Sequence, residues 1–175
     1  AAKIAIGLGE DRMYRYLRKF GFGEKTGIDL PGESVGILAK LPKWGSRTLP
    51  TVAIGQEISV TPLQLVTATA AIANGGNLMK PFIVQRIYSA RGDNILEREP
   101  EIRRRLVRDQ TARTLTDLLE NVVTHGTGKS AAIPGYRVAG KTGTAQKIDF
   151  SLGTYSKTKV VGSFVGYAPA DDPRF

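Results

Sequence analysis

The residues most able to do chemistry are grouped around one lysine in the last quarter of the 175-residue sequence. Residues 135–142 match the pattern G-x-x-x-x-G-K-[ST], from Gly135 through Lys141 to Thr142. This is the pattern of a phosphate-binding loop, in which backbone N–H groups surround the phosphates and the lysine reaches them. A nucleotide hydrolase that uses Gly135 to Thr142 is therefore one hypothesis for the function of the chain.

The residues on either side of this pattern disfavour a phosphate-binding loop. Such a loop leads directly from a buried strand into a helix whose first N–H groups bind the phosphates. Here Pro134, which cannot join a central strand, precedes Gly135. Gly143 and Thr144 follow the Lys-Thr pair, and they are a poor start for a helix. Residues 137–147 instead have the character of a strand that runs through the lysine.

A strand through Lys141-Thr142-Gly143-Thr144 suits a site of acyl transfer. The edge strand of a sheet can bind a substrate peptide by backbone pairing. Lys141 places a cation beside a nucleophile, and the hydroxyls of Thr142 and Thr144 can receive a substrate carboxylate. Gly143 has no side chain and lets a substrate approach the backbone. This strand is the second hypothesis for the site.

Other catalytic or metal-binding chemistry has few candidates. The chain has no Cys and one His, which excludes a disulfide framework, thiolate chemistry and a histidine-rich metal site. His125 precedes Gly126, so we expect it to end a helix near the negative end of the helix dipole. Asp171 and Asp172 are neighbours in a turn and are not a catalytic carboxylate pair. No cofactor and no metal are expected.

The pattern of helices followed by strands predicts an α+β fold with an antiparallel sheet. We expect helices over residues 1–6, 11–20, 62–73 and from 109 onwards, and strands over residues 82–88, 95–97, 137–147 and 159–167. Thr61 and Asp109 are placed to cap the last two helices, and Gly21 to end the second. An apolar stripe is expected on the last helix, formed by Leu115, Leu118, Leu119, Val122 and Val123. Residues 148–158 are polar enough for a loop at the rim of a functional site.

The excess of Lys and Arg over Asp and Glu has a simple interpretation. The net charge is +9, and eight arginines lie between Arg86 and Arg113. Five acidic residues are interspersed among them, and Tyr88 is the only aromatic residue in that stretch. Nucleic-acid surfaces usually combine a dense basic stripe with stacking aromatic residues. We therefore expect a solvated face of mixed charge and no nucleic-acid partner, and attraction to an anionic surface remains open.

Four stretches of the sequence, taken in order, resemble one known family. Residues 138–147 are similar to the third active-site motif, K-T-G, of the penicillin-binding proteins. Residues 20–33 resemble the segment after the second motif of that family. Residues 54–65, with 73–76, resemble the helix before the third motif, and residues 164–169 resemble the next strand. The resemblance spans the whole chain and is closest to the class B, division-type peptidoglycan D,D-transpeptidases.

The resemblance implies a β-lactamase/transpeptidase-like fold, with an antiparallel sheet flanked by helices. In that family a serine attacks the carbonyl of a D-Ala-D-Ala stem peptide, D-alanine leaves, and an amine of a neighbouring stem takes the acyl group. Lys141 is then expected to stabilise charge near the nucleophile and to assist proton transfer. Thr142 and Thr144 would bind the terminal carboxylate, and the Thr144 N–H would donate to the oxyanion. Gly143 would leave room for the substrate.

The resemblance also implies partners and a location. The expected ligands are peptidoglycan stem peptides and the β-lactams that mimic them, and the expected partners are cell-division membrane proteins. The protein would lie at the inner (plasma) membrane, with its catalytic domain on the extracytoplasmic or periplasmic side. A β-lactamase or penicillin-sensor relative and a non-catalytic scaffold remain alternatives.

The sequence departs from the family pattern at three points. Its single S-x-x-K, which begins at Ser156, follows the K-T-G motif, and we interpret it as a coincidence in a loop. No S-x-N triplet is present. We therefore expect residues 1–175 to be a partial transpeptidase domain, with these two motifs upstream and a final strand and helix downstream, and to be inactive alone. Glu57 stands where a glycine commonly follows Gly55-Gln56.

Overall fold

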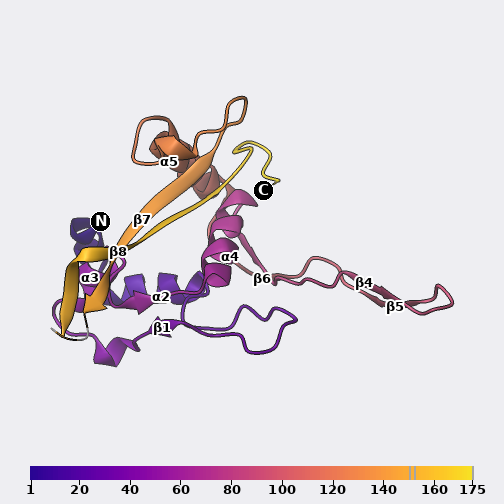
Figure 1. Cartoon of the computed structure of the whole chain (residues 1–175), viewed down its shortest axis with the longest axis horizontal. Coiled ribbons are helices and arrows are strands. Elements are labelled where there is room, and N and C mark those ends of the chain that lie inside the picture. Colours follow the sequence, from indigo (N-terminus) through magenta and orange to yellow (C-terminus); the bar gives the residue numbers. More distant parts are fainter. Residues whose placement is uncertain (150, 152, 175) are drawn as a thin grey trace.

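A computed structural model describes residues 1–149, 151 and 153–174, except for the side chain of Lys157 (Figure 1). The helices are α1 (Ala2–Leu8), α2 (Glu10–Lys19), α3 (Thr48–Val52), α4 (Pro62–Ala73) and α5 (Asp109–Thr124), with short 3₁₀ turns at Leu41–Lys43 and Lys129–Ala131. The strands are β1 (Ile37–Leu38), β2 (Ile58–Ser59), β3 (Asn77–Met79), β4 (Arg86–Tyr88), β5 (Asn94–Glu97), β6 (Ile102–Arg105), β7 (Ala139–Asp149) and β8 (Thr154–Tyr167). In the described residues the strands form four antiparallel pairs. The predicted α+β class is confirmed.

The long β7–β8 hairpin crosses the molecule in Figure 1. Its register begins with Ala139 opposite Tyr167 and ends with Asp149 opposite Thr154, with an irregularity between Gln146 and Ile148. The prediction of a loop over residues 148–158 is therefore wrong for most of that segment. Both strands continue into it because backbone pairing is maintained, with Ile148 opposite Tyr155. Phe150 and Leu152 lie outside the described residues.

Helix α5 packs against β7 and supports it from behind. Val123 of α5 forms a buried cluster with Val138 and Ala168, which lie just before β7 and just after β8. The hydroxyls of Thr116 and Tyr167 are 2.7 Å apart, and burial raises the pKa of Tyr167. These contacts fix the first residues of β7 relative to the helix.

The expected cap of α5 is wrong in detail. Asp109 is the first residue of the helix and not its cap, since Arg108 holds the cap position without a side-chain hydrogen bond. The Asp109 carboxylate instead pairs with Arg113 one turn later, at 2.8 Å. The predicted apolar stripe is only partly buried, because Val123 is 3% exposed whereas Leu118 is 59% exposed.

Helix α4 begins as the sequence predicts. Thr61 accepts a hydrogen bond from the N–H of Gln64, and the Gln64 side chain returns one from the N–H of Thr61, which completes a capping box. Gln64 is 1% exposed, and its amide also donates to the carbonyls of Glu24 and Val35, at 2.8 and 2.9 Å. One buried side chain therefore joins the start of α4 to the long loop after α2. Asn74 caps the end of the helix.

The hairpin of β4 and β5 projects from the body as an arm (Figure 1). The prediction of a strand over residues 82–88 is wrong for its first part. The N–H groups of Ile83 and Val84 bind the carboxylate of Asp29, at 2.9 and 3.2 Å, and not a partner strand. The hydrogen bond to Ile83 contributes most to lowering the pKa of Asp29. Asp29 also pairs with Arg98, so it holds the base of the arm.

The two N-terminal helices match their predicted ranges within a few residues. Ala1 caps α1 without a side-chain hydrogen bond, as expected from the absence of a polar residue there. Gly21 follows the last residues of α2 with a φ of 94°, a conformation that glycine adopts without strain. No helix among the described residues combines the length and apolarity that crossing a bilayer requires.

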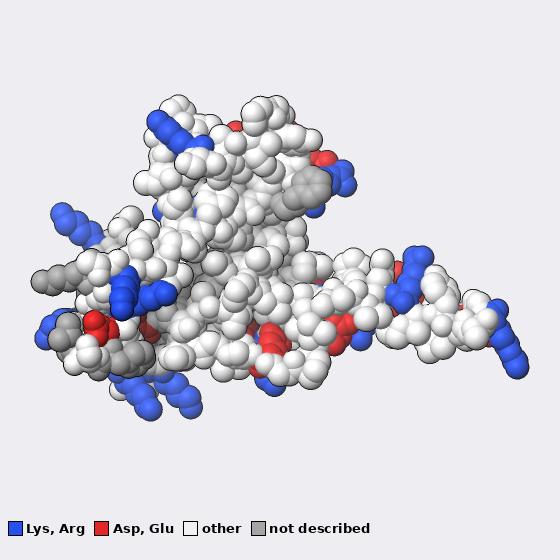
Figure 2. Space-filling view, in the orientation of Figure 1, with Lys and Arg blue, Asp and Glu red and all other residues white. Residues whose placement is uncertain are grey.

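Charged side chains of both signs are distributed over the face shown in Figure 2. In the stretch between Arg86 and Arg113, five of the eight arginines are in ion pairs with carboxylates. Glu24 alone is paired with Arg18, Arg103 and Arg104. This arrangement agrees with the expected face of mixed charge.

Candidate active site

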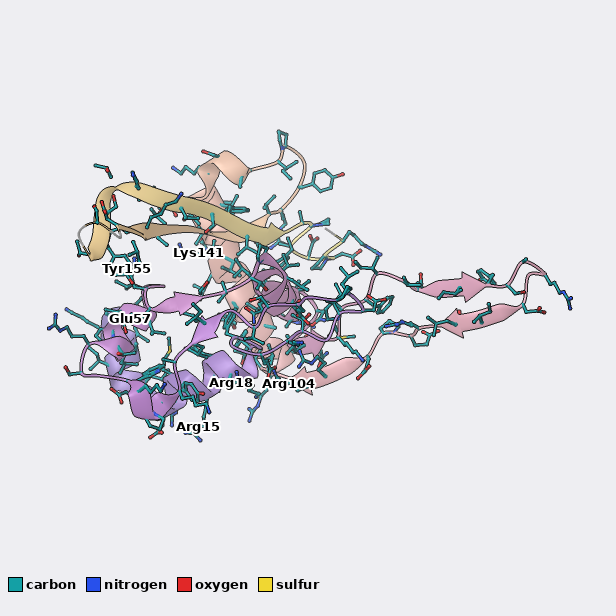
Figure 3. The ribbon with its side chains drawn as sticks, turned by 60° about the horizontal axis from the view of Figure 1, so that its bottom comes forward. Arg15, Arg18, Glu57, Arg104, Lys141 and Tyr155 are labelled. Atoms are coloured by element: carbon teal, nitrogen blue, oxygen red, sulfur yellow. The ribbon has the colours of Figure 1, made fainter. Side chains whose placement is uncertain are left out.

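Lys141, Thr142, Gly143 and Thr144 all lie within β7, on the strand that Figure 3 shows carrying Lys141. The strand continues through Asp149, so the helix that a phosphate-binding loop requires does not follow the lysine. The hypothesis of a phosphate-binding loop is therefore wrong. One edge of β7 pairs with β8, and the other has no partner strand among the described residues. That edge is open to an extended peptide.

Thr142 lies at the centre of a small polar group. The Lys141 ammonium donates to the Thr142 carbonyl at 2.9 Å and lies 3.4 Å from the Thr142 hydroxyl. The hydroxyl of Thr127 lies 2.6 Å from that of Thr142. A cation and two hydroxyls are therefore close together, and such groups bind a carboxylate well.

Sequence reasoning did not identify Thr127. It comes from the turn after α5, where Gly126 and Gly128 pack against Val122. A Cβ on either glycine would lie 2.9 to 3.1 Å from the Val122 carbonyl oxygen. The turn can therefore lie close to the helix end and present Thr127 to Thr142. The Gly-Thr-Gly sequence is the local signal that could have revealed it.

Glycines allow β7 and β8 to approach closely behind the motif. Gly140 lies opposite Gly166, and the ring of Phe164 lies against both. A Cβ on Gly140 would be 2.3 Å from the Phe164 ring and 2.9 Å from the Val165 carbonyl. A Cβ on Gly143 would meet only the Ser163 hydroxyl, at 2.6 Å. The first glycine is therefore required by packing, whereas the second leaves space beside the motif.

An ion pair fixes the chain just before β7. Arg137 donates two hydrogen bonds to Glu120 of α5, at 2.8 and 2.6 Å. This arrangement lowers the pKa of Glu120 and raises that of Arg137, in each case chiefly through the hydrogen bonds themselves. Arg137 was expected in the strand, but β7 begins at Ala139.

Ser156 is placed differently from the expected loop. It lies in β8, is 8% exposed, and its hydroxyl accepts hydrogen bonds from the N–H groups of Thr158 and Lys159. A strand does not supply the helix start from which a nucleophilic serine of this motif acts. The S-x-x-K that begins at Ser156 is therefore unlike the catalytic motif in its surroundings.

The one histidine lies at the end of α5. His125 caps the end of α5, as predicted, and its Nδ1 lies 2.8 Å from the Thr124 hydroxyl. In the part of the chain that the structure describes, no three His, Cys, Asp or Glu side chains are grouped as metal ligands.

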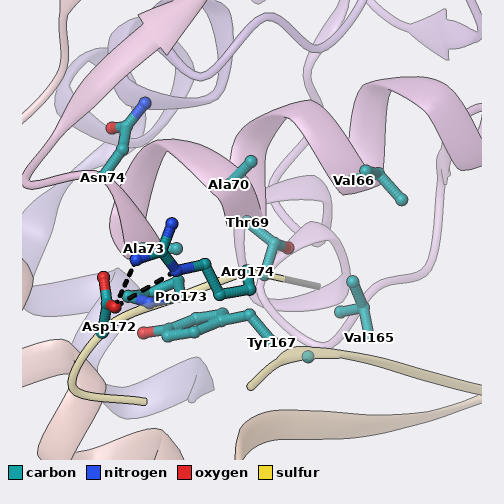
Figure 4. A pocket seen from close by; sticks show the side chains of 11 residues that line it. Val66, Thr69, Ala70, Ala73, Asn74, Val165, Tyr167, Asp172, Pro173 and Arg174 are labelled. Carbon is teal, nitrogen blue, oxygen red and sulfur yellow. Dashed lines mark hydrogen bonds and ion pairs between the residues drawn. The ribbon is translucent and has the colours of Figure 1, made fainter. Parts of the chain in front are cut away.

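Two hollows flank the β7–β8 hairpin. One, of about 480 Å³, lies between α4 and the segment after β8, beside Tyr167 and Arg174 (Figure 4). None of the motif residues lines it. The other, of about 330 Å³, lies beside the far half of β7 and includes Gln146 and Glu57. The second hollow is the one that continues from the motif along the strand.

Comparison with known proteins assigns the family. The family model described as the penicillin binding protein transpeptidase domain matches residues 1–175. Stage V sporulation protein D of Bacillus subtilis is 43% identical over 167 residues, which are 95% of this chain and 26% of that protein. Penicillin-binding protein PbpB of Mycobacterium tuberculosis is 40% identical over 175 residues, 96% of this chain and 26% of that protein.

A solved structure agrees with the sequence relatives. The crystal structure of penicillin binding protein 3 from Mycobacterium tuberculosis, complexed with aztreonam, is 39% identical and has a TM-score of 0.92. The match covers 99% of this chain and 40% of that one. The chain thus spans about a quarter of the length of these curated relatives. With the family model matching throughout, the chain belongs to the penicillin-binding protein transpeptidase domain family.

Proposed function

We propose that this chain forms the K-T-G side of the active site in a serine D,D-transpeptidase that cross-links peptidoglycan. The observation that carries the proposal is the polar group at Thr142, where Lys141 of β7 and Thr127 of the turn after α5 both lie beside the Thr142 hydroxyl. The second edge of β7 has no partner strand among the described residues. Family membership supports the same reaction, and a relative from Acinetobacter baumannii, 35% identical, is named peptidoglycan D,D-transpeptidase MrdA.

The reaction needs a carboxylate site and an oxyanion site on one strand. The terminal carboxylate of the stem peptide would bind the hydroxyls of Thr142 and Thr144, with the Lys141 ammonium nearby. A serine supplied by another part of the protein would attack the carbonyl carbon of the penultimate D-alanine. The negative charge that develops on the carbonyl oxygen would be stabilised by the Thr144 N–H.

Two steps complete the transfer. The C–N bond to the terminal D-alanine breaks, that amine takes a proton, and an ester to the serine remains. The amine of a second stem peptide then attacks the ester, loses a proton and regenerates the serine hydroxyl. Lys141 would assist these proton transfers and stabilise the charge that accompanies them. A β-lactam would stop the cycle at the ester, because its ring-opened acyl group is retained.

The full-length protein provides the test, by covalent labelling with a fluorescent penicillin. Lys141→Ala is expected to reduce the acylation rate by roughly a hundredfold or more, because a positioned proton-transfer group is lost. Lys147→Ala is the matched control, since Lys147 is an exposed lysine on the same strand. Normal labelling of the Lys141→Ala protein would exclude Lys141 from the mechanism.

Residues 1–175 alone are expected not to form a covalent penicillin adduct. The only S-x-x-K they contain begins in a strand, and they contain no S-x-N. A stable adduct on this segment, detected on a denaturing gel, would contradict the proposed partial domain.

We further propose a division role, division-protein partners at the plasma membrane and an extracytoplasmic catalytic domain. Similarity to a relative named FtsI homolog supports this role, and midcell localisation of a fluorescent fusion tests it.

A further inference from the structure

Two adjoining hollows beside α2 are lined by basic residues. One, of about 410 Å³, lies between α2 and the segment that joins β6 to α5, and its charged residues are Lys19, Arg105 and Arg108. The other, of about 360 Å³, lies along α2 and is lined by Arg12, Arg15, Tyr16 and Lys19. Tyr16 and Lys19 line both hollows, so the two form one continuous basic groove. Figure 3 shows Arg15 well away from Lys141 and the candidate active site.

The sequence of α2 places its cations along one stripe. Arg12, Arg15 and Lys19 are at positions i, i+3 and i+7, which fall on one face of a helix. At a rise of 1.5 Å per residue, the first and the last lie about 10 Å apart along the helix axis. Arg18 is half-buried beside this stripe and pairs with Glu24. The outer stripe therefore keeps its positive charge.

The five cations of the basic groove have no acidic partners. Among the residues that the structure describes, none of the five is in an ion pair, and all five are exposed. The neighbouring Arg103 and Arg104 are both paired with Glu24. Like charges gathered in this way repel one another, so an anion bound among them would relieve the repulsion.

Backbone carbonyls hold two of these cations in place. The Lys19 ammonium donates to the Leu106 carbonyl at 2.8 Å. The Arg105 Nε donates to the Val107 carbonyl at 3.1 Å. An ammonium has three N–H donors and a guanidinium has five, so both side chains keep donors for a ligand. Arg104 donates to the Lys19 carbonyl at 2.9 Å, which fixes the end of α2 against β6 and so fixes the two walls of the groove.

The shape and composition of the groove favour one class of anion. Its concave floor suits a narrow chain better than a flat lipid surface. Among the described residues that line it, Tyr16 is the one exposed large apolar side chain, whereas a membrane-binding face usually inserts several. A single aromatic residue is also too few for stacking successive nucleic-acid bases. Four of the five cations are arginines, whose planar guanidinium matches the oxygens of a phosphate group.

We infer that the basic groove binds a linear polymer that carries phosphate groups along its backbone. Successive phosphates would lie beside Arg12, Arg15 and Lys19, and the chain would continue past Arg105 and Arg108. This activity is separate from acyl transfer, because the groove shares no residue with the strand that carries Lys141. Its effect would be to hold the protein against a polyanion and to raise its local concentration there.

The probe is poly(glycerol phosphate) with a fluorophore at one end, titrated with the full-length protein while its anisotropy is measured. Five phosphate contacts on a flexible chain predict a slope of about −3.5 for the logarithm of the affinity against that of the salt concentration. The affinity is then expected to fall about a hundredfold between about 50 and 200 mM salt.

The double variant Arg12→Gln, Arg15→Gln removes two of these contacts. It is expected to bind the polymer about tenfold or more weakly at low salt and to reduce the salt slope by about 1.4. The matched control is Arg91→Gln, Lys147→Gln, which removes two exposed charges at the tip of the β4–β5 arm and on β7. The control should keep both the affinity and the slope. Thermal midpoints should stay close to that of the wild type in both variants, because all four side chains are exposed and outside ion pairs.

Several outcomes would overturn the inference. They include the absence of salt-dependent binding and an equal loss of affinity in the two double variants. Polyglutamate that competes as well as unlabelled poly(glycerol phosphate) would refute the preference for phosphate. Binding to phosphatidylglycerol vesicles without binding to the free polymer would assign the groove to a membrane surface instead.

Penicillin labelling reports on the proposed function separately. A protein that is labelled but does not bind the polymer would overturn the inference and leave the proposed function intact. A protein that binds the polymer through Arg12 and Arg15 but is not labelled would support the inference and overturn the proposed function.

Discussion

Two glycines of β7 are expected to respond differently to the same substitution, Gly140 by a loss of stability and Gly143 by a loss of acylation rate. In Gly140→Ala, the new methyl group would lie 2.3 Å from the Phe164 ring and 2.9 Å from the Val165 carbonyl. Ordinary carbon contacts are about 3.5 to 4.0 Å, so the ring must move by more than 1 Å and the strands must separate slightly. In Gly143→Ala, the methyl group meets only the Ser163 hydroxyl, which can rotate away.

The magnitudes follow from overpacking and from chain entropy. Overpacking of this degree costs about 1 to 3 kcal/mol, and alanine recovers roughly 0.5 kcal/mol by restricting the unfolded chain. We expect Gly140→Ala to lower the free energy of unfolding by about 1.5 kcal/mol, or the midpoint temperature by about 5 °C. Gly143→Ala should change the midpoint little but slow penicillin acylation about tenfold or more, because the proposed function places the substrate beside Gly143.

The assay is the fraction of full-length protein that still reacts with fluorescent penicillin after a heat challenge, with the acylation rate measured separately at low temperature. Phe164→Ala provides a further check, because removal of the ring should cost less in the Gly140→Ala background than in the wild type. An unchanged midpoint for Gly140→Ala, or equal losses of stability for both glycine variants, would refute the packing argument.

Three further predictions concern the supports of the site. Gln64→Glu removes two amide donors and sets a carboxylate oxygen against two carbonyls, so it should destabilise the fold by about 3 kcal/mol or more in chemical denaturation. Glu120→Gln should lower stability at neutral pH, where the Arg137 ion pair depresses the pKa of Glu120 below its ordinary 4.5. That difference should disappear as the pH falls through this lowered pKa, because protonation then removes the charge from wild-type Glu120 as well. Thr127→Val should weaken penicillin acylation several-fold while Thr127→Ser restores it, since only the hydroxyl reaches Thr142.

The parts of the fold that depend on local signals could be predicted from the sequence. The Thr61-Pro62 start of α4 and the glycine after α2 are determined by capping chemistry within a few residues. The choice between a phosphate-binding loop and a strand at Lys141 could also be made from Pro134 and Gly143. In each of these cases the deciding groups are neighbours in the sequence.

The remainder depends on contacts between distant residues. Ile83 and Val84 have the side chains of a strand, but their N–H groups bind Asp29, 54 and 55 positions away. The contact of Thr127 with Thr142 likewise requires α5 to be packed against β7. Backbone pairing extends the β7–β8 hairpin beyond its expected end. The polar composition of residues 148–158 had predicted a loop there, because composition does not show that the two strands pair. Periodicity carries no information about such partners.

The β4–β5 arm has a consequence for how the chain tolerates changes of length. Its side chains are exposed except for that of Leu96, which is half-buried, and a hydrogen bond from the Arg98 N–H to the Gln85 carbonyl closes its base. In most hairpins the loss of one residue would turn buried side chains outward. In this arm, a shift of the register by one residue would replace one largely solvent-exposed face by another. Insertions, deletions or a grafted epitope at the tip near Gly92 should therefore leave the rest of the molecule undisturbed.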